Sequence, residues 1–272
     1  MEIKRKPLVS IVTPVMDNLD FTKQMMTALS VCDSWPFELI IVDNASTDGT
    51  ADWIRNCGLE MAGKMIYNKI NNGFGKASNQ GYGAAKGEYL LFLNNDIVPT
   101  QGFITAMMET ILSDTKIGIV GARLAHPGKG SIQHAGVDEV DLRPNHTYFG
   151  LDMNDKRVMK QRDCMAVTGA CLLISKKLFE GINGFDEAYW CGWEDVDLCN
   201  KARKQGFRVV YEPKALLYHY ESRTAGRYDE DTKNSLIYMK RWVFNRDDYK
   251  VGKKGKDNKK QQKNAGIRQK FY

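Results

Sequence analysis

The sequence predicts an α/β protein with a Rossmann-like, mostly parallel central sheet flanked by helices. Strand-like and helix-like stretches alternate four times between residues 8 and 120, with short connections, which is the pattern of right-handed βαβ units. The predicted strands are nearly continuous apolar runs, as parallel strands buried on both faces are. The chain has 272 residues, of which 43% are hydrophobic and 26% charged, so it can bury a sizeable core.

The first half supplies its elements in regular order. Leu8–Thr13 is an alternating, β-branched run that Pro14 ends, and it is predicted as the first strand. Asp20 then stands where a helix cap is expected. The later elements predicted here are strands at Phe37–Val42, Lys64–Tyr67, Tyr89–Asp96 and Ile117–Val120, and helices at Ala51–Arg55, 71–85 and Gly102–Leu112.

The second half shows fewer regular elements. Residues 123–163 contain one strand candidate, Ser131–Val140, and a loop of this length in a compact domain is usually functional or mobile. The other predicted elements are strands at Ala166–Ser175, Arg208–Tyr211 and Ala215–Tyr220, and helices at Lys176–Glu180, Asp195–Gln205 and Asp229–Val243.

The net charge of +6 is concentrated at one end of the chain. Residues 250–272 carry nine Lys/Arg and one Asp, a net +8, while the other 249 residues carry 30 Lys/Arg and 32 Asp/Glu, a net −2. We expect this tail to be disordered because it lacks apolar periodicity. It is either simply solvated or a contact for acidic lipid headgroups. Nucleic acid is not expected as a partner, because the tail has no interleaved aromatic residues.

Cysteine usage and hydropathy predict a cytoplasmic protein, with a peripheral position at the inner face of the membrane as a further option. The six cysteines form no CxxC pair, so reduced thiols are expected. No apolar run approaches the ~18 residues of a membrane span. The N-terminal residues lead directly into a strand pattern rather than into a signal-peptide apolar region.

Polar side chains follow several of the predicted strands. Because parallel strands present their carboxyl ends at one edge of the sheet, we expect these residues to form one rim where ligands bind. The rim residues are Pro14–Asp17, Asp43–Asn44, Asn71–Asn72 and Asn94–Asp96.

Two rim carboxylates are candidate ligand contacts. Asp96, flanked by Asn94 and Asn95, suits a hard divalent cation that keeps waters and shares its charge with phosphates; a polar turn is the alternative. Asp43 can accept hydrogen bonds from a nucleobase imide or a ribose hydroxyl, with helix capping as the alternative. For Asp48 capping is favoured, since a helix follows at capping distance.

A second acidic site is predicted where a helix begins at Glu194 and Asp195. Adjacent acids there gain from the helix dipole and the free N–H groups, and Trp193 before them suits an aromatic platform for a sugar. One carboxylate can take a hydroxyl proton while the other holds the substrate; an acidic first helical turn is the alternative. His219 follows a short strand, where a lone histidine is either structural or a ligand.

Four ordered motifs carry a family resemblance. They read VSIVTP, ELIIVDNASTDGT, NNGFGKASNQGYGAAKGEYLLFLNND and GFDEAYWCGWEDVDLCNKARKQGFRVVYEP. Over about residues 7–222 the chain resembles a family 2 glycosyltransferase of the GT-A fold, in the rhamnosyltransferase-like branch.

The resemblance implies roles for individual residues. Asp96 matches the metal-binding carboxylate of the family's Asp-x-Asp motif, with Mn²⁺ or Mg²⁺ as cofactor and His219 as a further ligand, while Asn94 departs from the motif. Asp195 matches the catalytic base. Acceptor contacts are implied for Glu194 and Trp193. Nucleotide-sugar contacts are implied for Pro14, Val15, Asp17, Asp43, Asn72, Lys76, Asn94 and Asn95.

The activity that this resemblance implies is transfer of a sugar, with inversion, from a UDP- or dTDP-linked donor to a hydroxyl of a glycan or lipid-linked glycan. Residues 1–122 would bind the nucleotide sugar, residues 123–248 would form the acceptor-binding and catalytic half of the same GT-A domain, and residues 249–272 would be the basic tail.

Two alternatives remain. A sugar nucleotidyltransferase usually needs a Gly-rich, basic loop after the first strand, whereas Pro14–Asp20 is acidic and contains no glycine. A non-catalytic protein that binds a nucleotide sugar or carbohydrate is the other alternative. A dinucleotide oxidoreductase is not expected, because no GxGxxG follows the first strand.

Overall fold

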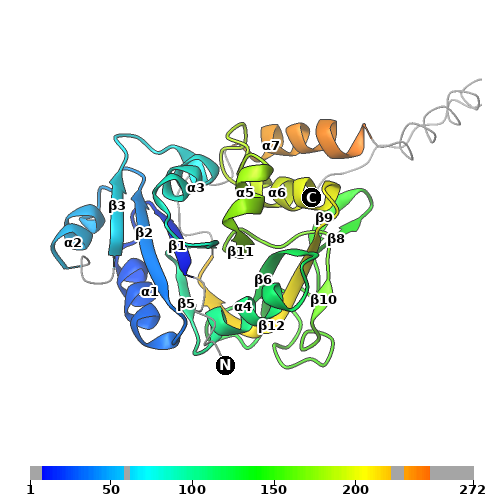
Figure 1. Ribbon diagram of the computed structural model, residues 1–272, viewed down its shortest axis with the longest axis horizontal. Coiled ribbons are helices and arrows are strands. Elements are labelled where there is room, and N and C mark those ends of the chain that lie inside the picture. Colours follow the sequence, from blue (N-terminus) through cyan, green and yellow to red (C-terminus); the bar gives the residue numbers. More distant parts are fainter. Residues whose placement is uncertain (1–7, 58–61, 222–229, 246–272) are drawn as a thin grey trace, which may run out of the picture.

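The computed structural model describes residues 8–57, 62–221 and 230–245. In this part of the chain ten strands form one sheet in the order β10-β12-β6-β11-β4-β1-β2-β3, with β5 paired to β12 and β7 to β6 (Figure 1). Strands β8 and β9 form a separate hairpin. The strands are β1 (Val9–Val15), β2 (Phe37–Asp43), β3 (Ala62–Tyr67), β4 (Tyr89–Leu93), β5 (Ile97–Pro99), β6 (Ile117–Ala125), β7 (Ile132–His134), β8 (Val137–Val140), β9 (Arg143–His146), β10 (Arg162–Asp163), β11 (Cys171–Ser175) and β12 (Arg208–His219).

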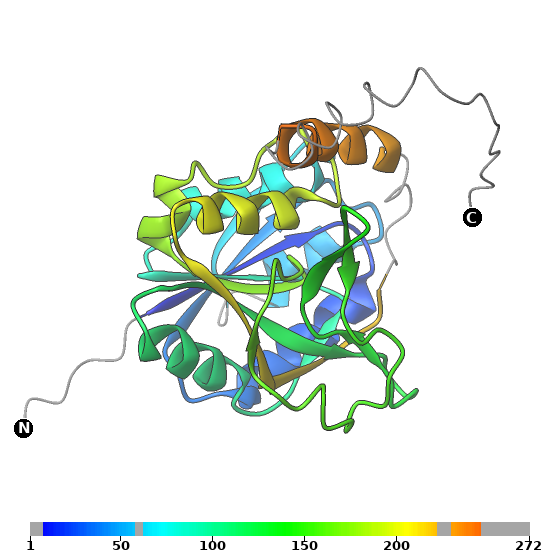
Figure 2. The same ribbon diagram turned by 90° about the vertical axis from the view of Figure 1, so that its right-hand side faces the viewer.

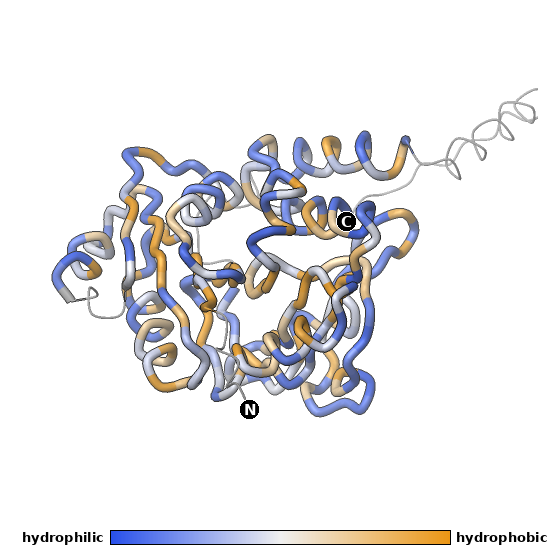
Figure 3. The backbone as a smooth tube through the Cα atoms, in the orientation of Figure 1, coloured by the Kyte–Doolittle hydropathy of each residue, from blue (hydrophilic) through white to orange (hydrophobic). Residues whose placement is uncertain are grey.

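Helices cover both faces of this sheet, so it is the middle of three layers (Figure 2). Met25, Ile54 and Met107 from α1, α2 and α4 pack on one face, and Phe179 and Leu198 from α5 and α6 pack on the other. The inner strands consist largely of hydrophobic residues, while many connecting loops are hydrophilic (Figure 3). The helices are α1 (Leu19–Cys32), α2 (Thr50–Cys57), α3 (Gly73–Ala84), α4 (Phe103–Ser113), α5 (Lys176–Gly181), α6 (Glu194–Lys204) and α7 (Asp231–Tyr238), the last continued by the π-helical turn η1 (Met239–Val243).

The sheet is mostly parallel, as predicted. Strands β3, β2, β1 and β4 are parallel neighbours, and β6 and β12 are parallel to each other. Strand β11 lies antiparallel between β4 and β6. Burial on both faces explains the apolar runs: Ile11, Val12 and Leu91 have no exposed surface.

Several predicted boundaries were wrong. β1 continues through Pro14, which is tolerated because β1 pairs with β4 only as far as Val12. β4 ends at Leu93 rather than Asp96. The single strand expected at residues 131–140 is two strands, separated where Gly136 adopts a φ of 92°.

Two short strands predicted near the end of the sheet are one long strand. β12 is continuous from Arg208 to His219, with a register shift between Glu212 and Leu216. Pro213 lies in that shift and lacks the N–H that a regular ladder needs. Helix α1 begins after Asn18, so Asp20 lies in its first turn instead of capping it.

Free thiols are found at Cys32, Cys164, Cys171, Cys191 and Cys199. Burial raises the pKa of the Cys171 and Cys199 thiols. No helix within the described ranges combines the length and apolarity needed to span a membrane. The basic tail predicted at residues 249–272 lies outside the described residues.

Candidate active site

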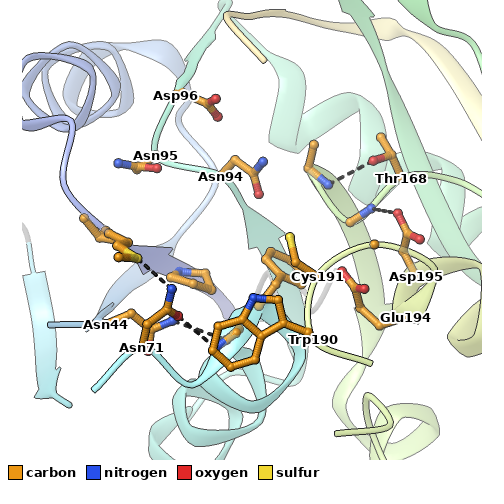
Figure 4. A pocket seen from close by; sticks show the side chains of 18 residues that line it. Asn44, Asn71, Asn94, Asn95, Asp96, Thr168, Trp190, Cys191, Glu194 and Asp195 are labelled. Atoms are coloured by element: carbon orange, nitrogen blue, oxygen red, sulfur yellow. Dashed lines mark hydrogen bonds between the residues drawn. The ribbon is translucent and has the colours of Figure 1, made fainter. Parts of the chain in front are cut away.

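A pocket lies beyond the carboxyl ends of β1 and β4 (Figure 4). Residues that follow these strands form one wall, including Asn94, Asn95 and Asp96. The loop at residues 168–170 and the turn that leads into α6 form the other, which carries Glu194 and Asp195. Acidic side chains that are far apart in the sequence therefore share one cleft.

Asp195 is held by the backbone around it. One carboxylate oxygen accepts a hydrogen bond from the Gly169 N–H at 2.8 Å, and the other accepts from the Val196 N–H at 2.8 Å. A Cβ at position 169 would lie 3.0 Å from the Phe74 ring, so a larger residue there would have to displace that ring. Asp195 is also in the first turn of α6, where the helix dipole favours negative charge. These interactions fix the orientation of a carboxylate in the pocket.

Asp96 reaches its position through the short pairing of β5 with β12. His219 is the pairing partner of Ile97, and the Tyr220 N–H donates to the Asp96 carbonyl at 3.0 Å. The carboxylate Oδ1 of Asp96 consequently lies 3.0 Å from Nε2 of His219. Both residues are buried, with exposed fractions of 8% and 3%.

The hydrogen bonds behind His219 determine its tautomer. The Gln133 amide donates to the Glu221 carboxylate at 2.7 Å, which identifies its nitrogen and leaves its oxygen facing Nδ1 of His219 at 2.6 Å. Since an amide oxygen only accepts, Nδ1 carries the proton. In the neutral imidazole Nε2 is therefore an acceptor, and it faces the Asp96 carboxylate oxygen at 3.0 Å, with the Asn94 amide nitrogen 3.4 Å away.

Comparison with known proteins assigns the family. The family model described as "Glycosyl transferase family 2" matches residues 10–182. This chain belongs to glycosyl transferase family 2. A second model, "N-terminal domain of galactosyltransferase", matches residues 156–224, which include the turn before α6 and all of β12.

Relatives of this family 2 chain include the O-antigen biosynthesis protein RfbC of Myxococcus xanthus, 30% identical over 81% of this chain and 18% of RfbC. The N-acetylglucosaminyl-diphospho-decaprenol L-rhamnosyltransferase of Mycobacterium tuberculosis is 24% identical over 75% of this chain and 73% of its own length. The chain spans 27% and 18% of the lengths of two curated relatives that match it at 30% identity.

Solved structures confirm the GT-A fold. GalNAc-T7, crystallised with UDP, GalNAc and Mn²⁺, superposes with a TM-score of 0.68 at 15% identity, over 91% of this chain and 49% of that one. At 15% sequence identity, this structural similarity supports a shared fold and nothing more specific.

The residues of this family 2 chain fit a divalent cation. No group of three or more His, Cys, Asp or Glu in the described ranges could hold a metal. Asp96 and His219 offer two ligand atoms 3.0 Å apart, and an ion held by them would take its remaining ligands from water and phosphate. A cation between the Nε2 lone pair and the carboxylate would relieve their repulsion. The hydrogen bond from Nδ1 to Gln133 is of the kind that metal-bound histidines make.

Other predicted ligand contacts lie beside the pocket rather than in its lining. Asp17 accepts hydrogen bonds from the backbone and hydroxyl of Thr47. Asp43 is buried and accepts from the Ser46 N–H at 3.3 Å. Asn72 is the N-cap of α3, and Lys76 is exposed on that helix. Pro14 and Val15 do line the pocket.

Trp193, the residue predicted as an aromatic platform for a sugar, does not line the pocket. Trp190 lines the pocket (Figure 4). The Trp193 ring instead packs on Tyr238, with 5.2 Å between the ring centroids, and its indole N–H donates to Asp231 at 2.7 Å. Two tryptophans three residues apart thus have different neighbours. The sequence alone did not show which of the two lines the pocket.

Sequence reasoning missed Thr168, Gly169 and Gln133. Thr168 and Gly169 lie inside a run that looked like one buried strand, although the regular strand begins only at Cys171. The sole signal was a glycine within that run, which often marks a close backbone approach. Gln133 lies in a short, fully buried strand and offered no signal.

Proposed function

We propose that this chain transfers a sugar from a nucleoside diphosphate sugar to an acceptor hydroxyl, with inversion at the anomeric carbon. The observation that carries the proposal is the shared pocket, in which Asp195 lies on one wall and Asp96 on the other. A carboxylate base on one side and a phosphate-binding site on the other are the two parts that such a displacement needs.

Asp195 is the proposed base. Its hydrogen bonds from Gly169 and Val196 hold the carboxylate and leave further lone-pair directions to accept a proton from an acceptor hydroxyl. As this hydroxyl loses its proton, it attacks the anomeric carbon from the side opposite the departing diphosphate. A single base and a single displacement give inversion. Glu194, beside it in the pocket, is proposed to bind the acceptor.

Asp96 and His219 are proposed to hold the metal. Mn²⁺ or Mg²⁺ bound there would offset the charge that grows on the leaving diphosphate. Gln133 keeps the His219 ring oriented, and the buried position of both ligands limits competition from water.

The substrates are proposed from the relatives. UDP- or dTDP-linked sugars are the proposed donors, bound mainly by residues 1–122. A glycan or lipid-linked glycan is the proposed acceptor, bound by residues 123–248. The names of the O-antigen protein and of the diphospho-decaprenol rhamnosyltransferase support this class of acceptor.

The test is a panel of UDP- and dTDP-sugars, assayed for released nucleoside diphosphate with and without Mn²⁺ or Mg²⁺. We expect Asp195→Asn to reduce transfer by about 10²–10⁴-fold, the usual contribution of a general base, while UDP or dTDP binding by calorimetry is retained. Asp20→Asn, an exposed carboxylate on α1, is the matched control.

Full turnover by Asp195→Asn would remove the base assignment. Binding of nucleotide sugars without release of a nucleoside diphosphate would point to a non-catalytic binding protein. Pyrophosphate formed from a nucleoside triphosphate and a sugar phosphate would identify a nucleotidyltransferase.

A further inference from the structure

The turn at residues 190–193 connects the pocket wall to α6, and helix α7 holds it from outside. Asn234 on α7 has no exposed surface. Its Oδ1 accepts a hydrogen bond from the Trp190 N–H at 3.3 Å, and its Nδ2 donates to the Cys191 carbonyl at 2.9 Å. One side chain therefore bonds the backbone of two successive pocket residues.

The same turn is held on its other side by α3. The Trp190 carbonyl accepts from the Phe74 N–H at 3.1 Å. Gly73, with a φ of 75°, lies so close that a Cβ there would overlap this carbonyl oxygen. The backbone of the turn is thus clamped between α3, from the first half of the chain, and α7, near its end.

The turn ends in a strained residue that α7 also supports. Trp193 has a φ of 77°, which is unfavourable for a bulky side chain and persists only when its surroundings impose it. Those surroundings are the Tyr238 ring and the Asp231 carboxylate, both on α7. The next residue, Glu194, begins α6.

Helix α7 can act as a brace because its last residue, Tyr238, and the turn η1 that continues it are tied to α6. Asp197 is completely buried, and its Oδ1 accepts hydrogen bonds from Arg241 and from the Trp242 indole, each at 2.7 Å. The Asn200 amide donates to the Tyr238 hydroxyl at 3.1 Å. The turn, α6 and α7 are therefore linked by buried polar contacts.

We infer that Asn234 is a positioning residue for the acceptor side of the site. By bonding Trp190 and Cys191 it fixes the turn, and hence the wall formed by Trp190 and the start of α6 with Asp195. This inference rests on the proposed transfer reaction with Asp195 as base. Asn234 itself does not line the pocket, so its loss should alter acceptor use and leave nucleotide binding intact.

The experiment compares the wild-type 272-residue chain with its Asn234→Ala and Asn234→Asp variants. The aspartate has the same shape but cannot donate to the Cys191 carbonyl. Ser235→Ala is the matched control, because that hydroxyl donates to the Thr232 carbonyl within α7 itself. The measurements are hydrogen exchange of residues 186–195, binding of UDP and dTDP, and kcat and KM for the acceptor.

We expect faster exchange of the turn in both Asn234 variants, with unchanged exchange in β1 and β4. Nucleotide Kd should stay within about twofold, while kcat/KM for the acceptor falls by about 100-fold in Asn234→Ala, as misplacement by roughly 1 Å can cause. A larger share of the nucleotide sugar should be hydrolysed by water instead of being transferred to the acceptor. Asn234→Asp should show a smaller loss, and Ser235→Ala none.

Unchanged exchange of the turn, or wild-type acceptor kinetics in Asn234→Ala, would overturn the inference. So would a parallel loss of nucleotide binding with faster exchange throughout the chain, which is the signature of a purely structural role. If the wild type transfers sugar from no donor, the proposed function fails, and the exchange comparison still decides whether Asn234 holds the turn.

Discussion

Three buried polar side chains at the site and one half-buried carboxylate form a connected series. It runs from Glu221 through Gln133 and His219 to Asp96. The carboxylate at one end orients the Gln133 amide, this amide determines which His219 nitrogen is protonated, and the other nitrogen faces Asp96. The chemistry available at the pocket is thus decided partly by residues that do not line it.

Gln133→Leu removes the acceptor for the Nδ1 proton of His219. We expect Mn²⁺ affinity to fall by about 10–100-fold, the usual effect of losing a partner of a metal-bound histidine. Titration with Mn²⁺, followed by electron paramagnetic resonance, measures this directly. Gln101→Leu, at an exposed glutamine just before α4, is the control, and equal affinities in the two variants would speak against His219 as a ligand.

At the scale of elements, Asp48 joins the starts of two helices. It was predicted to cap the helix that follows it, and its Oδ1 does accept from the Thr50 N–H at 3.0 Å and from the Thr50 hydroxyl. Its second oxygen also accepts from the Leu19 N–H at 2.9 Å, at the beginning of α1. The loop next to the pocket is consequently tied to both α1 and α2.

These hydrogen bonds change the acidity of Asp48. Partial burial alone would raise its pKa, but the bonds from Thr50 and Leu19 outweigh burial and hold the pKa below its ordinary value. A carboxyl group with a depressed pKa in the folded state stabilises the fold above its unfolded-state pKa, and this contribution is lost as the pH falls through the folded-state pKa.

Asp48→Ala should therefore lower the free energy of unfolding by about 1 kcal/mol at pH 7, the typical value for losing a helix cap. The difference from wild type should shrink as the pH falls below the unfolded-state pKa of about 4 and then through the lower folded-state pKa. Urea unfolding at pH 7 and pH 3 tests both points. Asp52→Ala is the control: it removes an exposed ion pair with Arg55, so it should change the free energy of unfolding by less than about 1 kcal/mol. If the effect of Asp48→Ala did not change with pH, the stability of the fold would not depend on ionisation of Asp48.

At the scale of the whole molecule, the charge is divided between a nearly neutral body and a basic end. Residues 250–272 carry a net +8 and lie outside the described residues. Attraction to an anionic surface amounts to about 1 kcal/mol per basic residue close to it. A membrane contact of this kind would suit a lipid-linked acceptor.

We expect the full chain to co-sediment with phosphatidylglycerol vesicles but not with phosphatidylcholine vesicles, and the binding to weaken as salt screens the charges. Exchanging five lysines for glutamine should reduce it strongly without affecting turnover of a soluble acceptor. If the wild-type chain and the five-lysine variant sedimented equally with the vesicles, the tail would not be a membrane contact but a solvated segment. The exchanged residues are Lys253, Lys254, Lys256, Lys259 and Lys260.

The sequence by itself determined the α/β class, most helices and the inner strands, because these follow from local periodicity and from turn residues. It also placed Asp96 and Asp195 near the ends of elements, where ligands bind. Strands β5, β9 and β10 were not predicted, because they are short, and β9 and β10 are largely exposed, so no apolar pattern marks them.

Only the tertiary structure decided how distant segments meet. The pairing of β5 with β12 brings Asp96 to His219, and the loop at residue 169 meets Asp195 through a backbone N–H, a group that every residue type except proline possesses. Likewise, Trp190 and Trp193 differ through their contacts with α3 and α7. Such contacts depend on long-range packing and backbone hydrogen bonds, which leave no periodic trace in the chain.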